Sequence, residues 1–115
     1  MAFIIKRNDT RPVLRAQLTS TDPNDDANQI AVDLTTATQV KFFMRLAPDT
    51  GTLEISGTAV VTDAANGRVS YTFQPSDTDT TGVYLAEFEV TWGADKQTFP
   101  SDSYIPIEVK ADLGP

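Results

Sequence analysis

Alternation of apolar and polar side chains is the feature that most constrains the fold of this chain. It is clearest in residues 39–46 and 84–92, where every second residue is apolar and most residues between them are polar. Residues 68–73 and 105–110 repeat the pattern. A period of two places the apolar set on one face of a β-strand, where it can be buried. We expect about eight strands, the shorter ones at residues 3–6, 12–18, 30–34 and 58–62.

The remaining composition favours turns over helices. Of the 16 acidic residues, 12 are Asp and 4 are Glu, and Asp prefers turns whereas Glu prefers helix interiors. The pair Asn66-Gly67 accepts the positive φ angles of a tight turn and predicts a hairpin closing before residue 68. Further turns are expected at residues 48–51 and 92–96, and residues 19–29 are expected to form a polar loop.

Many short strands without a crossover helix predict a single all-β domain over residues 1–115, an antiparallel sandwich. Its core is predicted from the alternation, with the following residues buried between two sheets: Val40, Phe42, Val69, Tyr71, Ala86, Phe88, Val90, Ile105 and Ile107.

One turn motif indicates which kind of sandwich to expect: an immunoglobulin-like one of about seven to nine strands. Asp79, Gly82 and Tyr84 stand at the start of the strongest strand, where such folds carry a Tyr whose hydroxyl ties back to upstream backbone. Ala86 occupies the position of a Cys in antibody domains, and Phe42 would take the place of their core Trp. The simpler interpretation is a strand that happens to follow a polar turn.

The charge and the missing residue types exclude several functions. The chain has 9 basic and 16 acidic residues, a net charge of −7, which disfavours nucleic acid as a partner. It has no Cys and no His, so disulfides, thiolate metal sites, a Cys nucleophile and a Ser–His triad are impossible. We expect no enzyme activity and no cofactor. The acid pair Asp77 and Asp79 is better explained by turn formation than by acid–base catalysis.

Targeting signals are not expected either. The apolar run before Lys6 is too short for a signal peptide, and no apolar stretch approaches the roughly 18 residues of a membrane span. The chain is therefore expected to be made in a host cytoplasm and not to enter a membrane.

Three stretches together resemble a known phage family. They are Phe3-x-Ile5-Lys6-Arg7-Asn8-Asp9-Thr10-Arg11-Pro12, then Gly67-Arg68-Val69-Ser70-Tyr71 with Asp79-Thr80-Thr81-Gly82-Val83-Tyr84, and finally Thr98-Phe99-Pro100-Ser101. Their order and spacing are similar to the immunoglobulin-like N-terminal domain of phage baseplate upper proteins.

The resemblance implies a non-enzymatic virion protein that docks onto other virion proteins or onto copies of itself. In baseplate upper proteins a coiled-coil stalk follows this domain, whereas this chain ends at Pro115 without heptads. A place on the tail, baseplate, neck or capsid therefore stays open. An alternative function is a phage-surface adhesin that contacts host glycans through exposed aromatic residues, for which the candidates are Trp92, Phe43 and Tyr104.

Calcium binding by the segment 19–29 is the remaining ligand hypothesis. Its carboxylates and amides have the spacing of a calcium loop, and Asp33 falls at the twelfth position. However, Ala27 stands where helix–loop–helix calcium sites need Gly, and no flanking helices are predicted. A solvated polar loop is the preferred interpretation, and no metal site is assigned.

The sequence also predicts a protein-docking surface. In an immunoglobulin-like sandwich, residues 39–46 and 83–92 are antiparallel neighbours in one sheet. Their outward positions include Lys41, Phe43 and Arg45 on one strand, and Leu85, Glu87 and Glu89 on the other. The charges are expected to form cross-strand pairs around the apolar Phe43 and Leu85. These two side chains either dock a partner or lie under a covering loop or N-terminal segment. Arg7 and Arg11 form a second candidate site for a protein partner.

Overall fold

The computed structural model describes residues 3–22, 24–47, 54–100 and 103–113, and these contain eleven β-strands and two 3₁₀ helices. The strands are β1 (Phe3–Lys6), β2 (Leu14–Gln17), β3 (Thr19–Asp22), β4 (Asp25–Ala31), β5 (Gln39–Leu46), β6 (Glu54–Thr58), β7 (Val60–Asp63), β8 (Arg68–Tyr71), β9 (Gly82–Trp92), β10 (Asp95–Phe99) and β11 (Ile105–Lys110). The 3₁₀ helices are η1 (Ala64–Asn66) and η2 (Pro75–Thr78). The predicted all-β class is confirmed, with more strands than the predicted seven to nine.

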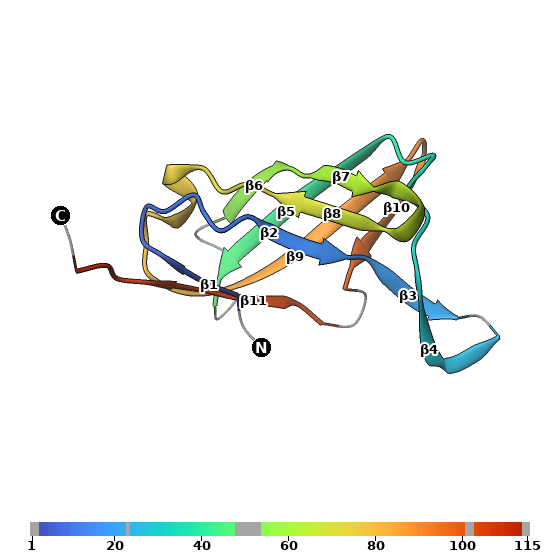
Figure 1. Ribbon diagram of the computed structural model, residues 1–115, viewed down its shortest axis with the longest axis horizontal. Coiled ribbons are helices and arrows are strands. Elements are labelled where there is room, and N and C mark those ends of the chain that lie inside the picture. The colour runs from blue at the N-terminus through green and yellow to red at the C-terminus, as the bar shows by residue number, and fades with distance from the viewer. Residues whose placement is uncertain (1–2, 23, 48–53, 101–102, 114–115) are drawn as a thin grey trace.

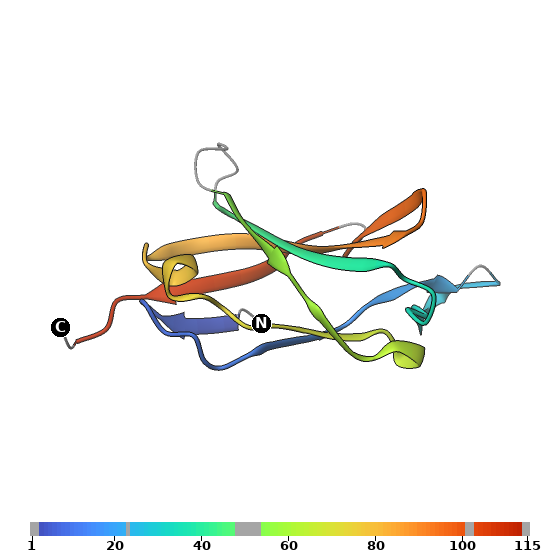
Figure 2. The same cartoon turned by 90° about the horizontal axis from the view of Figure 1, so that it is seen from above.

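Two sheets packed face to face form the body of the molecule (Figure 2). The larger has the order β1-β11-β9-β5-β6, with β10 also paired to β9, and the smaller has the order β2-β8-β7. The predicted antiparallel pairing of β5 with β9 is confirmed over the whole of β5. The predicted antiparallel architecture is confirmed, and the structure adds one parallel pair, β1 with β11, that the prediction did not include. This arrangement is compatible with an immunoglobulin-like sandwich.

Aromatic side chains from both sheets meet at the centre of the core. Phe42 of β5 stacks on Tyr71 of β8 with ring centroids 4.2 Å apart, and it meets the edge of Phe88 of β9 at 5.3 Å. Phe73, which follows β8, packs edge-on against Phe42 at 6.0 Å. All predicted core residues are buried except Ile105, which is partly buried at the start of β11. The core therefore joins the two sheets through large rings rather than through aliphatic residues alone.

The chain changes sheets at Ala59, which corrects the prediction of one strand over residues 58–62. β6 pairs with β5 in the larger sheet, whereas β7 pairs with β8 in the smaller one. Ala59 is buried between them, and its N–H donates to the carbonyl of Val40 at 2.9 Å. Gly57 makes this crossing possible, because a Cβ there would lie 2.6 Å from the ring of Tyr71.

The predicted turns at residues 65–67 and 92–96 are both present. Gly67 has φ +68° after η1, and β7 and β8 pair on either side of the turn. Gly93 has φ +59° between β9 and β10, whose register pairs Trp92 with Asp95. The turn expected at residues 48–51 lies outside the described residues.

Residues 19–29 do not form the predicted polar loop. They belong to a β-hairpin of β3 and β4, which extends from the body in Figure 1 and is called the arm below. Thr19 donates to the Gln29 side chain at 3.3 Å, and the amide of Gln29 donates to the Thr21 hydroxyl at 3.1 Å. β4 ends at Ala31, so the strand predicted over residues 30–34 is also misplaced. In the described part of the hairpin, cross-strand polar pairs of Thr19, Thr21 and Gln29 hold the two strands together.

A candidate protein-docking surface

The six residues predicted for the docking surface share the outer face of the larger sheet, which is the face turned away from the smaller sheet. The β5–β9 register sets Lys41 opposite Glu89, Phe43 opposite Glu87, and Arg45 opposite Leu85. Residues directly opposite each other in a ladder lie on the same face. The two strands thus place the candidate residues side by side.

The predicted charge pairing is changed by β10, which the docking prediction did not include. The Nζ atom of Lys96 lies 3.9 Å from a carboxylate oxygen of Glu89. Arg45 lies opposite the apolar Leu85 of β9 on one side and opposite Glu54 of β6 on the other. The Lys96 side chain is 69% exposed, and an ion pair so exposed adds little stability, so its charge remains available at the rim.

Apolar residues extend this outer face toward the β1 edge. Phe43 and Leu85 are partly buried, whereas Val83 is 47% and Ile4 51% exposed. Ile4 lies opposite Glu108, which in turn lies opposite Val83. Because β1 joins the sheet at its edge, it lies beside the outer face instead of folding over Phe43 and Leu85. Of the two covers in the alternative interpretation, a loop or the N-terminal segment, β1 therefore does not lie over these side chains.

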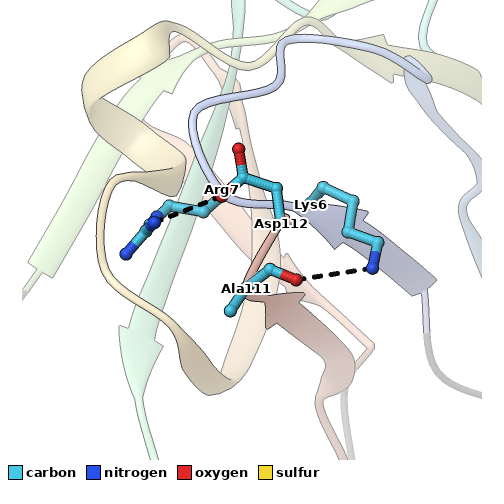
Figure 3. A network of polar contacts seen from close by, with 4 residues as sticks. All are labelled: Lys6, Arg7, Ala111 and Asp112. Carbon is cyan, nitrogen blue, oxygen red and sulfur yellow. Dashed lines mark hydrogen bonds and ion pairs between the residues drawn. The ribbon is translucent and has the colours of Figure 1, made fainter. Parts of the chain in front are cut away.

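The N-terminal basic residues lie at the end of the molecule where β1 and β11 finish (Figure 3). Arg7 donates to Asp112 at 3.2 Å, and the ammonium of Lys6 donates to the carbonyl of Ala111 at 3.4 Å. The N–H of Arg7 also donates to the carbonyl of Lys110 at 2.8 Å. These contacts tie the segment after β1 to the segment after β11.

Arg7 and Arg11 were predicted as a second docking site, but Arg7 makes a contact within the chain. Arg7 is engaged with Asp112, and its Nε atom is buried without a hydrogen-bond partner. Arg11 is exposed. The geometry makes Arg7 a link between the two ends of the chain, and it leaves Arg11 as the candidate for outside contacts.

The Tyr84 contact expected from the sequence is present. The side chain is fully buried, and its hydroxyl donates to the carbonyl of Thr80 at 2.7 Å. Burial raises the pKa of Tyr84, the charge of Asp79 raises it further, and the bond to Thr80 acts in the opposite direction. Gly82 adopts φ +145°, and a Cβ there would lie 2.7 Å from a methyl group of Leu46. These residues fix the start of β9.

A second tyrosine anchor was missed by the sequence reasoning. The hydroxyl of Tyr71 donates to a carboxylate oxygen of buried Asp77 at 2.6 Å, and that same oxygen accepts the N–H of Gln74 at 2.8 Å. Burial raises the pKa of Tyr71, and the hydrogen bond and charge of Asp77 raise it further. Gln74 and Asp77 form a capping box around η2, with Pro75 at its start, and this local spacing is a signal that could have found the anchor. The sequence predicted that Asp77 takes part in a turn, and its bond from the N–H of Gln74 at η2 agrees with this.

The segment considered for calcium binding, residues 19–29, does not have helix–loop–helix geometry, because its strands β3 and β4 form the arm. Asp33, placed at the twelfth ligand position, accepts hydrogen bonds from the N–H of Thr35 at 2.9 Å and from its hydroxyl at 2.7 Å. These bonds lower the pKa of Asp33 below its ordinary value. Within the described ranges, no three acidic, His or Cys side chains cluster as metal ligands would.

The aromatic candidates for glycan contact do not gather on one surface. Trp92 belongs to the core-facing set of β9 and packs against the core, whereas Phe43 faces outward from β5. Tyr104 is 53% exposed and precedes β11. Of these residues, Phe43 alone lies on the outer face described above.

These features describe an all-β sandwich domain with a charged and apolar outer face. The chain belongs to the family of the BppU N-terminal domain, a phage baseplate upper protein domain, which its sequence matches over residues 25–109. It is thus a phage baseplate-related structural domain, located in the virion among other virion proteins. Comparison with curated proteins gives no match.

The matched segment contains β5, β9 and the complete outer-face set, whereas β1 and β2 precede it. Among the described residues there is no helix long and apolar enough to cross a membrane.

Proposed function

We propose that the domain is a non-catalytic docking module that joins another virion protein through the outer face of its larger sheet. The observation that carries this proposal is the register of β5 against β9. It places partly exposed Phe43 and Leu85 on neighbouring strands, surrounded by Lys41, Glu87 and Glu89. An apolar centre with a charged rim is the usual composition of a protein interface.

The exposed residues beside this centre support the same surface. Val83 lies next to Leu85 two positions along β9, and Ile4 continues the apolar area across Glu108. Monomeric proteins rarely expose contiguous apolar area without a function. The family supplies the class of partner, since a baseplate domain assembles with other virion proteins. Both charge signs at the rim favour a partner with a mixed charged surface rather than a nucleic acid.

The test is a phage carrying the double substitution Phe43→Ser and Leu85→Ser in this protein. We expect the variant domain to fold, and its copy number in purified particles to fall at least about tenfold, because both changes remove apolar contact area from the interface. The copy number is measured by quantitative mass spectrometry of the particles, and folding by thermal melting of the isolated domain.

The matched control is the double substitution Val60→Ser and Val61→Ser. It removes exposed apolar residues from β7, at the edge of the smaller sheet, and should leave the copy number unchanged. If the outer-face variant folds and still joins particles at the wild-type copy number, this docking surface is wrong. An Arg11→Glu variant then tests the N-terminal candidate in the same assay.

A further inference from the structure

We propose that two copies of this chain pair through the free edge formed by β2 and β3, with the arm of each copy lying in a groove of the other. This surface is separate from the outer face of the larger sheet. β2 ends the order of its sheet, and β3 pairs with β4 alone among the described strands. The two strands follow each other along residues 14–22 with their partners on the same side, so the opposite side forms one long edge.

The backbone of this edge is ready to accept a further strand. The N–H of Leu18 donates to Gly67 at 2.8 Å, and its carbonyl accepts the N–H of Val32 at 2.9 Å. Backbone groups of successive residues in an antiparallel strand point to alternate sides. The odd-numbered residues Arg15, Gln17, Thr19 and Thr21 therefore direct their N–H and C=O groups away from β8 and β4. Edge strands in this condition are templates for pairing with another chain.

A groove of about 720 Å³ runs along the same edge. Its apolar lining comes from both sheets and includes Leu14 and Leu18 on one side, and Phe99, Pro100 and Ile105 on the other. Among the described residues that line it, Arg15 is the one charged residue, and the other polar lining residues are uncharged. An uncharged strand with an apolar side chain turned toward this lining would fit the groove.

Residues 19–21 of the arm are such an uncharged stretch, and Ile30 on the neighbouring strand β4 supplies the apolar side chain. Ser20 lies opposite Ile30 in the hairpin, and both continue the side of the chain on which Leu14 and Leu18 face the core. Ile30 is 44% exposed there. A two-stranded hairpin is marginally stable in water by itself, and pairing β3 with a strand of a second copy gives the arm the additional neighbour that it lacks.

Antiparallel pairing about Leu18 uses the full edge, because Leu18 is the midpoint of residues 14–22. It sets Gln17 of one copy opposite Thr19 of the other, and the arm of each copy beside β2 of the other. The start of the edge is basic, with Arg11 and Arg15, and the arm sequence is acidic, with Asp22, Asp25 and Asp26. A twofold axis places the basic start of each copy beside the acidic arm of the other copy. The same edge on both copies is therefore complementary in charge.

Cysteine trapping in this Cys-free chain tests the pairing and its register together. A chain with Gln17→Cys is mixed with a chain with Thr19→Cys under mild oxidation, and disulfide-linked pairs are measured by non-reducing electrophoresis. We expect the mixed pair to form at least about tenfold faster than either same-variant pair, because directly opposite residues in this register are about 5.5 Å apart at Cα. Faster linkage of the Gln17→Cys chains to each other would overturn the register, and no preferential linkage would overturn the edge pairing.

Sedimentation velocity over a concentration series tests the contribution of the arm. We expect wild-type chains to approach twice the mass of one chain, and Ile30→Thr to raise the dimer dissociation constant at least about tenfold, because the change acts twice in each dimer. Val60→Thr is the matched control, since it alters an exposed branched residue on the β7 edge. A wild-type chain that stays monomeric at every concentration, or an equal effect of both substitutions, would contradict the proposal.

Discussion

The β5–β9 pair and the arm are both antiparallel β-structure, yet different forces hold them. In β5–β9, alternate residues such as Phe42 and Phe88 are fully buried between two sheets, and the register follows from their burial. The arm is a separate two-stranded sheet, and its described side-chain contacts are hydroxyl–amide bonds of Thr19, Thr21 and Gln29. The body should therefore depend on packing, whereas the arm should depend on local pairing and on any chain that binds beside it.

The largest expected effect is that of Phe88→Ala in the centre of the body. The side chain is fully buried and meets Phe42 edge-on, so its removal leaves a cavity that costs about 3–5 kcal/mol of unfolding free energy. Denaturant unfolding measures the loss. The same experiment on Ile30→Ala should give a change below about 1 kcal/mol for the monomer, because Ile30 is largely exposed. Equal losses at both positions would remove the proposed difference between body and arm.

A smaller effect is expected for Tyr84→Phe at the start of β9. The change keeps the buried ring and deletes the hydrogen bond to the carbonyl of Thr80, which should cost about 1 kcal/mol. Thermal or denaturant unfolding is the measurement. An unchanged stability would show that packing of the ring, rather than its hydroxyl, fixes this end of the body.

The smallest effect concerns Asp33, just beyond the arm. Its pKa is lowered by the bonds from Thr35, so its carboxylate favours the folded state at neutral pH, and this contribution is lost as the pH falls through the lowered pKa. An NMR titration should place the pKa of Asp33 below 3.8 in the wild type and nearer to that value in Thr35→Ala. Equal pKa values of Asp33 in the two proteins would show that the hydrogen bonds from Thr35 do not lower its pKa.

The same contrast explains what could be predicted from the sequence. The pattern predicts a strand over residues 39–46, the bounds of β5, because one buried face imposes a period of two on the sequence. The outer-face set around Phe43 and Leu85 followed from the same period once β5 and β9 were taken as neighbours. Residues 19–29 carry no such period in their sequence and are therefore expected to form a loop, although β3 and β4 pair there.

Other parts depended on partners that lie far away in the sequence. The parallel pairing of β1 with β11 joins the two ends of the chain, and the Arg7–Asp112 ion pair follows from it. The chain changes sheets at Ala59, beside Gly57, where the absence of a Cβ leaves room for the ring of Tyr71 from the other sheet. A local pattern carries no information on which distant residue will meet it.

The sequence by itself therefore determined the all-β class, the central strands, most of the core and the Tyr84 turn. Each of these rests on side-chain alternation or on local backbone preference, which neighbouring residues encode. Only the tertiary structure decided how the strands divide between two sheets, which edges stay free, and that the arm extends beside a groove at the β2 edge. Those features arise when distant strands compete for the same hydrogen-bonding edges and apolar surfaces, and the outcome depends on the whole fold.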